Sequence, residues 1–184
     1  MLLEKILEKL GLKKEPKKSE LKNLEVANTI KPYILDRPLT FYLIADTNHV
    51  NPNIQKKIFE YNVSICEGRE KNVVVFTDIF TPEDTEEEIL NYDTIFPWRN
   101  TVRYWIEKKI KIFPIFPSHH YNWIDEIVNA KMFELFKSQF DKYVKDNPEI
   151  NICIIDVGYS HAPYLKEKIE ELFPNQKLEF IVVE

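Results

Sequence analysis

Glycine is scarce in this chain of 184 residues, with only three copies (Gly11, Gly68 and Gly158) against 11 prolines. Loops that wrap phosphate groups depend on glycine, because only a residue without a Cβ lets the backbone approach the anion closely. Neither the G-x-G-x-x-G fingerprint of dinucleotide-binding proteins nor the G-x-x-x-x-G-K-[ST] motif of P-loop proteins occurs. The sequence therefore excludes both of these nucleotide-binding motifs.

Cysteine, basic charge and long apolar runs are also in short supply. Two cysteines, Cys66 and Cys153, cannot build a disulfide framework, and this usage predicts a reducing, cytoplasmic location. The 30 acidic against 25 basic residues give a net charge of −5, which argues against a nucleic-acid partner. No apolar stretch approaches the roughly 20 residues of a membrane helix, so we expect no membrane span.

The first 23 residues differ in character from the rest. Residues 1–14 predict an amphipathic helix, and residues 13–23 are basic and polar and contain Pro16, which is typical of a linker. Residues 24–184 predict a single α/β domain. The helix could pack on its own domain or mediate a homodimer; the alternative is a membrane-surface anchor, because basic residues follow its apolar face. The alternation of Glu and Lys along the helix favours packing.

Segments with the character of strands alternate with helical segments after residue 38. Strands are predicted at 39–45, 73–80, 111–116, 150–157 and 178–183. Helices are predicted at 52–66, 97–109, 123–144 and 163–172, and one more begins at Thr81 and Pro82. This order predicts a mainly parallel sheet of about five strands with helices on both faces.

All four histidines follow predicted strands by a few residues: His49, His119, His120 and His161. Three acids lie at or near strand ends as well: Asp46, Asp78 and Asp156. The carboxyl ends of parallel strands open onto one edge of the sheet, where ligands bind in folds of this class. Each residue alone could be structural, as Asp46 would be if it capped the following helix. We nevertheless favour a convergent His/Asp site at this edge.

Several of these segments carry motif-like spacing. Ala45-Asp46-Thr47-Asn48-His49 follows the first strand, and Gly158-Tyr159-Ser160-His161 follows the fourth. Trp98 and Arg99 begin a helix that also carries Trp105, and Asn129-Ala130-Lys131-Met132 lies in the next helix. Between residues 39 and 184 this ordered set resembles the superfamily of erythromycin esterase-like, ChaN-like haem-binding and TraB/TIKI proteins. Members have G-E-x-x-H or G-x-x-H after an early strand, an acid ending another strand, and a late second G-x-x-H.

The resemblance implies two histidines and one or two carboxylates around a pocket. The implied catalytic residues are His49, Asp46, Asp78 and His161. The residues expected at the rim or in ligand binding are His119, His120, Asp156, Tyr159, Trp98 and Arg99. Alanine replaces the first motif glycine and aspartate replaces both motif glutamates, which leaves open a degenerate, non-catalytic member. Gly158 is kept, and we expect a tight backbone turn there.

The chemistry that such a site could carry is hydrolysis of an ester or amide-like bond in a small-molecule or peptide-like ligand. A neutral imidazole can take a proton from water while a carboxylate orients it, as His49 could do with Asp46 or Asp78. His161 could polarise a carbonyl or complete a divalent-metal site with His49 and Asp78. The rival interpretation is a non-catalytic module that binds a metal or, as the lesser alternative, haem. Tyr159 and the histidines could then ligate iron.

Overall fold

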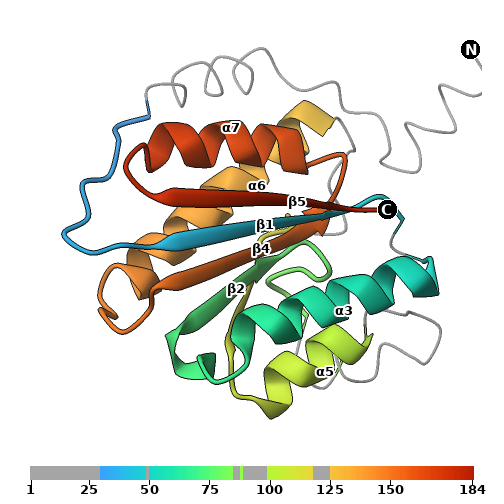
Figure 1. The fold of residues 1–184 in the computed structure, drawn as a ribbon. Helices are drawn as coiled ribbons and strands as arrows, with labels where there is room; N and C mark the ends of the chain where they lie inside the picture. Colours follow the sequence, from blue (N-terminus) through green and yellow to red (C-terminus); the bar gives the residue numbers. More distant parts are fainter. Residues whose placement is uncertain (1–29, 49, 85–87, 89–98, 118–124) are drawn as a thin grey trace, which may run out of the picture.

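The computed structural model describes residues 30–184 except 49, 85–87, 89–98 and 118–124 (Figure 1). At Arg99 and Asp125 it describes the backbone alone. The amphipathic helix and linker predicted for residues 1–23, and any homodimer made through them, lie outside the described residues.

A sheet of five parallel strands forms the centre of the structure, in the order β3-β2-β4-β1-β5. In chain order its members are β1 (Thr40–Asp46), β2 (Val73–Thr77), β3 (Lys111–Pro114), β4 (Ile152–Gly158) and β5 (Lys177–Val183). Every residue of β2 and β4 is buried, as expected for near-continuous apolar strands covered on both faces. The predicted parallel α/β fold is therefore confirmed.

Helices cover both faces of the sheet (Figure 1). One face carries α3 (Pro52–Cys66) and α5 (Arg99–Glu107) over a core that includes Ile44, Ile58 and Trp105. The other carries α6 (Asp125–Gln139) and α7 (Ala162–Leu172) over a larger core rich in phenylalanine. Within the described part of the chain, no helix is both long enough and apolar enough to cross a membrane.

One detail of the predicted elements needs correction. The helix predicted as one piece at 123–144 changes to a π-helical turn at Phe140–Val144. The turn expected at Gly158 is present: β4 ends there, and the amide of His161 donates to the carbonyl of Gly158 over 3.0 Å, which closes a turn over Tyr159 and Ser160. Of the glycines that the structure describes, Gly68 is the one with positive φ, at 72°, in the turn after α3.

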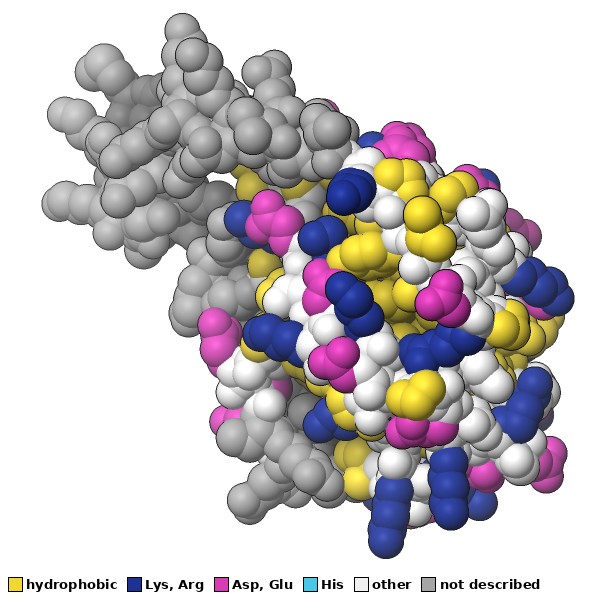
Figure 2. All heavy atoms as spheres, turned by 90° about the vertical axis from the view of Figure 1, so that its left-hand side faces the viewer, with side chains coloured by type: hydrophobic (Ala, Val, Ile, Leu, Met, Phe, Trp, Pro, Cys, Tyr) yellow, Lys and Arg dark blue, Asp and Glu magenta, His cyan; other side chains and the backbone are white. Residues whose placement is uncertain are grey.

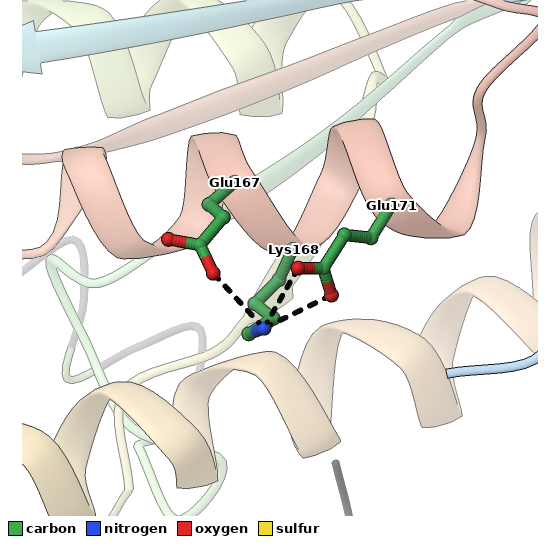
Figure 3. A network of polar contacts seen from close by, with 3 residues as sticks. All are labelled: Glu167, Lys168 and Glu171. Carbon is green, nitrogen blue, oxygen red and sulfur yellow. Dashed lines mark hydrogen bonds and ion pairs between the residues drawn. The ribbon is translucent and has the colours of Figure 1, made fainter. Parts of the chain in front are cut away.

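A charged cluster on α7 joins Lys168 to Glu167 and Glu171 (Figure 3). Nζ of Lys168 lies 2.9 Å from Oε2 of Glu171 and 3.1 Å from Oε1 of Glu167. Burial alone would lower the pKa of Lys168, but its hydrogen bonds with both glutamates raise that pKa above its ordinary value. Lys168 thus keeps its proton and is a poor candidate for a nucleophile.

Candidate functional site

The carboxyl edge of the sheet, where the strands end, brings three of the predicted acids close to the centre of the fold. Strands β2, β4 and β1 are adjacent, and Asp46 at the end of β1 is paired in register with Gly158 at the end of β4. Asp156 is in register with Thr77, the residue before Asp78. The loop Gly158–His161 therefore starts between the ends of β1 and β2.

Hydrogen bonds tie this loop to both neighbouring strands. The amide N–H of Gly158 donates to Oδ2 of Asp78 over 2.8 Å. The amide of Tyr159 donates to the carbonyl of Asp46 over 2.7 Å, and that of His161 donates to the carbonyl of Gly158 over 3.0 Å. The Asp78 carboxylate thus holds the backbone of the loop that leads to His161.

His161 lies at the start of α7, on the side of the sheet that α6 and α7 cover. Its side chain is 9% exposed, and its Nδ1 lies 2.6 Å from Oδ1 of Asn129 in α6. The ring of Phe116 flanks it, with 6.3 Å between ring centroids and a tilt of 60°. No residue of the described part of the chain forms a hydrogen bond with its Nε2. Among the described residues, the imidazole is therefore anchored through Nδ1.

Asp46 and Asp156 face the opposite side of the sheet, because side chains alternate along a strand and both share the side of Ile44 and Ile154. Oδ2 of Asp46 accepts a hydrogen bond from Nε2 of Gln55 over 2.9 Å. Oδ2 of Asp156 accepts one from Nδ2 of Asn62 over 3.1 Å. These carboxylates are 4% and 2% exposed. They lie beneath α3, whereas His161 is held from α6 across the sheet.

Not every predicted site residue can be placed. His49, His119, His120 and Trp98 lie outside the described residues, as does the side chain of Arg99. Tyr159 is at the edge and 48% exposed. Their assignment to the rim or to catalysis stays a prediction.

A metal site was predicted from His49, Asp78 and His161. Among the residues that the structure describes, no group of three or more His, Cys, Asp or Glu side chains could hold a metal ion. Because His49 is outside that set, the predicted trio is not tested. Nε2 of His161 is a described donor that suits a divalent metal, since the other ring nitrogen is oriented by Asn129.

The cysteines are poor nucleophiles. Both are fully buried, and neither lies at the carboxyl edge. Burial, assisted by the charge of Glu70, raises the pKa of Cys66 to about 12, and burial also raises the pKa of Cys153. A neutral thiol is a weak nucleophile, so covalent thiol catalysis is not supported.

The site also contains residues that the sequence analysis did not single out for a role. Asn129 was noted within a motif, but its partner His161 lies 32 residues away in the sequence. Gln55 and Asn62 are buried polar residues on the inner side of α3, among Ile54, Ile58 and Ile65. An amide on an otherwise apolar helix stripe is the signal that could have revealed them.

Two grooves of about 460 Å³ lie away from these residues, on either side of the loop after β2. One is lined by Phe80, Asp84 and β3, the other by Glu83, Pro117 and the outer face of α6. Neither lining includes His161, Asp46, Asp78 or Asp156. We place the candidate site at the carboxyl edge and not in either groove, because the oriented imidazole of His161 lies at that edge.

Comparison with protein-family models, with curated proteins and with solved structures returned no match. The resemblance to the erythromycin esterase-like superfamily therefore remains a prediction from the motifs.

Proposed function

We propose that this chain is a hydrolase-like α/β protein that cleaves an ester or amide-like bond at the carboxyl edge of its sheet. The observation that carries the proposal is His161: a nearly buried imidazole, anchored by Asn129 at Nδ1, with no described partner at Nε2. A histidine held in this way is suited to proton transfer, because its orientation is fixed while one nitrogen stays open.

In the proposed reaction, water attacks the carbonyl carbon of the ligand while Nε2 of His161 takes the proton from that water. The carbon–oxygen or carbon–nitrogen bond of the tetrahedral intermediate then breaks, and the departing alcohol or amine receives the proton from the imidazolium. Asp78 contributes by fixing Gly158 and so the loop before His161. His49 and Asp46 remain proposed members of the site. A divalent metal bound by His49, Asp78 and His161 would supply an activated water instead.

A panel of esters and amides tests the proposal. We expect the wild-type protein to cleave at least one substrate, and His161→Gln to reduce kcat by about 10²–10⁴-fold, as for loss of a general base. The matched control is Lys166→Ala, a partly exposed position on the same helix, which should leave the rate unchanged. Absence of cleavage by the wild type, or an unchanged rate in His161→Gln, would refute the proposal.

One observation favours the second candidate, a non-catalytic module that binds a metal or haem. The buried carboxylates of Asp46 and Asp156 accept hydrogen bonds from amides of α3, which suits structural acids better than reacting ones. Metal analysis and a haem titration test this candidate. It predicts stoichiometric binding that is lost in His161→Ala, without hydrolysis. The cytoplasmic location and the small-molecule or peptide-like ligand also remain predictions from the sequence.

A further inference from the structure

The contact between His161 and Asn129 constrains where the imidazole carries its proton. Nδ1 of His161 lies 2.6 Å from Oδ1 of Asn129, within hydrogen-bond distance. A carboxamide oxygen only accepts hydrogen bonds, so the hydrogen in this contact belongs to Nδ1. A neutral imidazole has a single N–H, and Nε2 is then left with a lone pair.

We propose that Asn129 is a positioning residue that holds His161 in the Nδ1–H tautomer and so makes Nε2 a hydrogen-bond acceptor. This tautomer bears on the roles that the sequence left open for His161, which were to polarise a carbonyl or to complete a metal site. With Nε2 unprotonated, the neutral ring cannot donate a hydrogen bond to a carbonyl oxygen, but it can take a proton from an O–H group. The group that Nε2 can engage is therefore a hydrogen-bond donor, such as a water or a ligand hydroxyl, or a metal ion. The catalytic meaning of this assignment rests on the proposed function; the tautomer itself does not.

The surroundings of Asn129 favour a fixed contact. Its side chain is 8% exposed and sits in α6 beside Val128, which is buried in the core. Helices α6 and α7 pack on the same face of the sheet, so the two partners are held by separate elements of one core (Figure 1). An amide also differs from the carboxylate that often orients a histidine. It selects the tautomer without adding a negative charge that would favour the imidazolium.

The opposite arrangement is equally well defined, which makes the proposal testable. If the amide of Asn129 were turned by 180°, its Nδ2 would donate to Nδ1, and the hydrogen of the neutral ring would move to Nε2. His161 would then be a donor to a carbonyl oxygen rather than a base. The two arrangements exclude each other.

Long-range ¹H–¹⁵N correlation spectra of the full chain labelled with ¹⁵N-histidine distinguish them. His161 is assigned by the signals lost in His161→Gln, and spectra are recorded over a series of increasing pH values until they no longer change. We expect Nδ1 to resonate as a pyrrole-type nitrogen and Nε2 as a pyridine-type nitrogen. Asn129→Asp keeps an acceptor and should keep this tautomer, whereas Asn129→Leu should shift it toward Nε2–H.

A wild-type spectrum with the hydrogen on Nε2, or an unchanged tautomer in Asn129→Leu, would overturn the proposal. If Asn129→Leu does not fold, the wild-type and Asn129→Asp spectra still decide, because both must show Nδ1–H.

No substrate is needed, so the result is separable from the proposed function. An Nδ1–H tautomer without hydrolysis refutes the function alone; an Nε2–H tautomer with hydrolysis that depends on His161 refutes the role of Asn129 alone. Given activity, Asn129→Leu should lower kcat about tenfold or more with little change in KM.

Discussion

At the scale of single residues, the side chain of Asn62 in α3 joins three elements of the fold. Its Nδ2 donates to Oδ2 of Asp156 and to the carbonyl of Ile58, each over 3.1 Å. Its Oδ1 accepts from Nε1 of Trp105 over 3.2 Å. Asn62 and Trp105 are both fully buried. One amide therefore satisfies polar groups of α3, β4 and α5 at once.

Replacing Asn62 by Leu should reduce the free energy of unfolding by about 2–4 kcal/mol. The substitution keeps the volume but removes one donor to the buried Asp156 carboxylate and the acceptor of Trp105, each a loss of about 1–3 kcal/mol. Urea denaturation followed by circular dichroism measures the change. Glu60→Ala, an exposed change on the same helix, serves as the control and should stay within about 0.5 kcal/mol. A loss below about 1 kcal/mol in Asn62→Leu would show that the hydrogen bonds of Asn62 contribute little to the free energy of unfolding.

The buried thiol of Cys66 should make the free energy of unfolding depend on pH. In the folded protein the pKa of its thiol is raised from 9.0 to about 12, so the folded state keeps the proton while an unfolded chain releases it above pH 9. The unfolded state is then favoured progressively, and the free energy of unfolding should fall between pH 9 and about 12. In Cys66→Ala this decline should be shallower. Equal pH slopes for both proteins in urea denaturation would contradict the assignment.

The acids at the strand ends show what the sequence could and could not predict about single residues. Their place at the carboxyl edge follows from strand order along the chain and from parallel pairing. The side that each carboxylate faces does not, because a shift of one residue in a strand end reverses every side chain. Asp46 and Asp156 face α3, where they accept hydrogen bonds from the buried side-chain amides of Gln55 and Asn62. No short sequence motif marks these amides.

At the scale of elements, α3 is the helix that positions both amides. Gln55 and Asn62 are seven residues apart, close to two helical turns, so they share one face. The helix begins at Asn51, whose side chain accepts hydrogen bonds from the amides of Asn53 over 2.9 Å and Ile54 over 3.4 Å. Pro52 follows at the first helical position, where a missing N–H costs nothing.

Asn51→Ala should therefore lower the free energy of unfolding by about 1 kcal/mol through loss of the helix cap. Asn51→Asp keeps an acceptor oxygen at the same position and should retain most of the stability. Thermal and urea denaturation of the two variants side by side provide the measurement. If both variants lose the same stability, the capping interaction is not what sets the start of α3.

The positions of strands and helices followed closely from the sequence, because apolar periodicity and turn residues are local signals. The π-helical turn at Phe140–Val144 did not, since the apolar spacing of Phe136 and Phe140 is the same in an α-helix. The strand order β3-β2-β4-β1-β5 could not be predicted from the sequence either. It depends on which helix packs on which face, and local patterns carry no such information.

At the scale of the whole molecule, the two edges of the sheet differ in character. The opposite, amino edge presents, among the described residues, Lys, Arg, Asp and Glu side chains mixed around apolar ones (Figure 2). The carboxyl edge gathers Asp78, Gly158 and His161 through hydrogen bonds from separate strands and helices. The strand order makes this possible, because it places β4 between β2 and β1.

The central claim is that the carboxyl edge around His161 is the ligand site. Titration of the ¹⁵N-labelled protein with small esters and amides, followed by amide chemical shifts, tests it most directly and does not require turnover. We expect the largest shifts at Gly158, Tyr159, His161 and Asp78, and a weaker response in His161→Gln. Shifts confined to the groove residues near Phe80 and Ile112, or to the amino edge, would contradict this account.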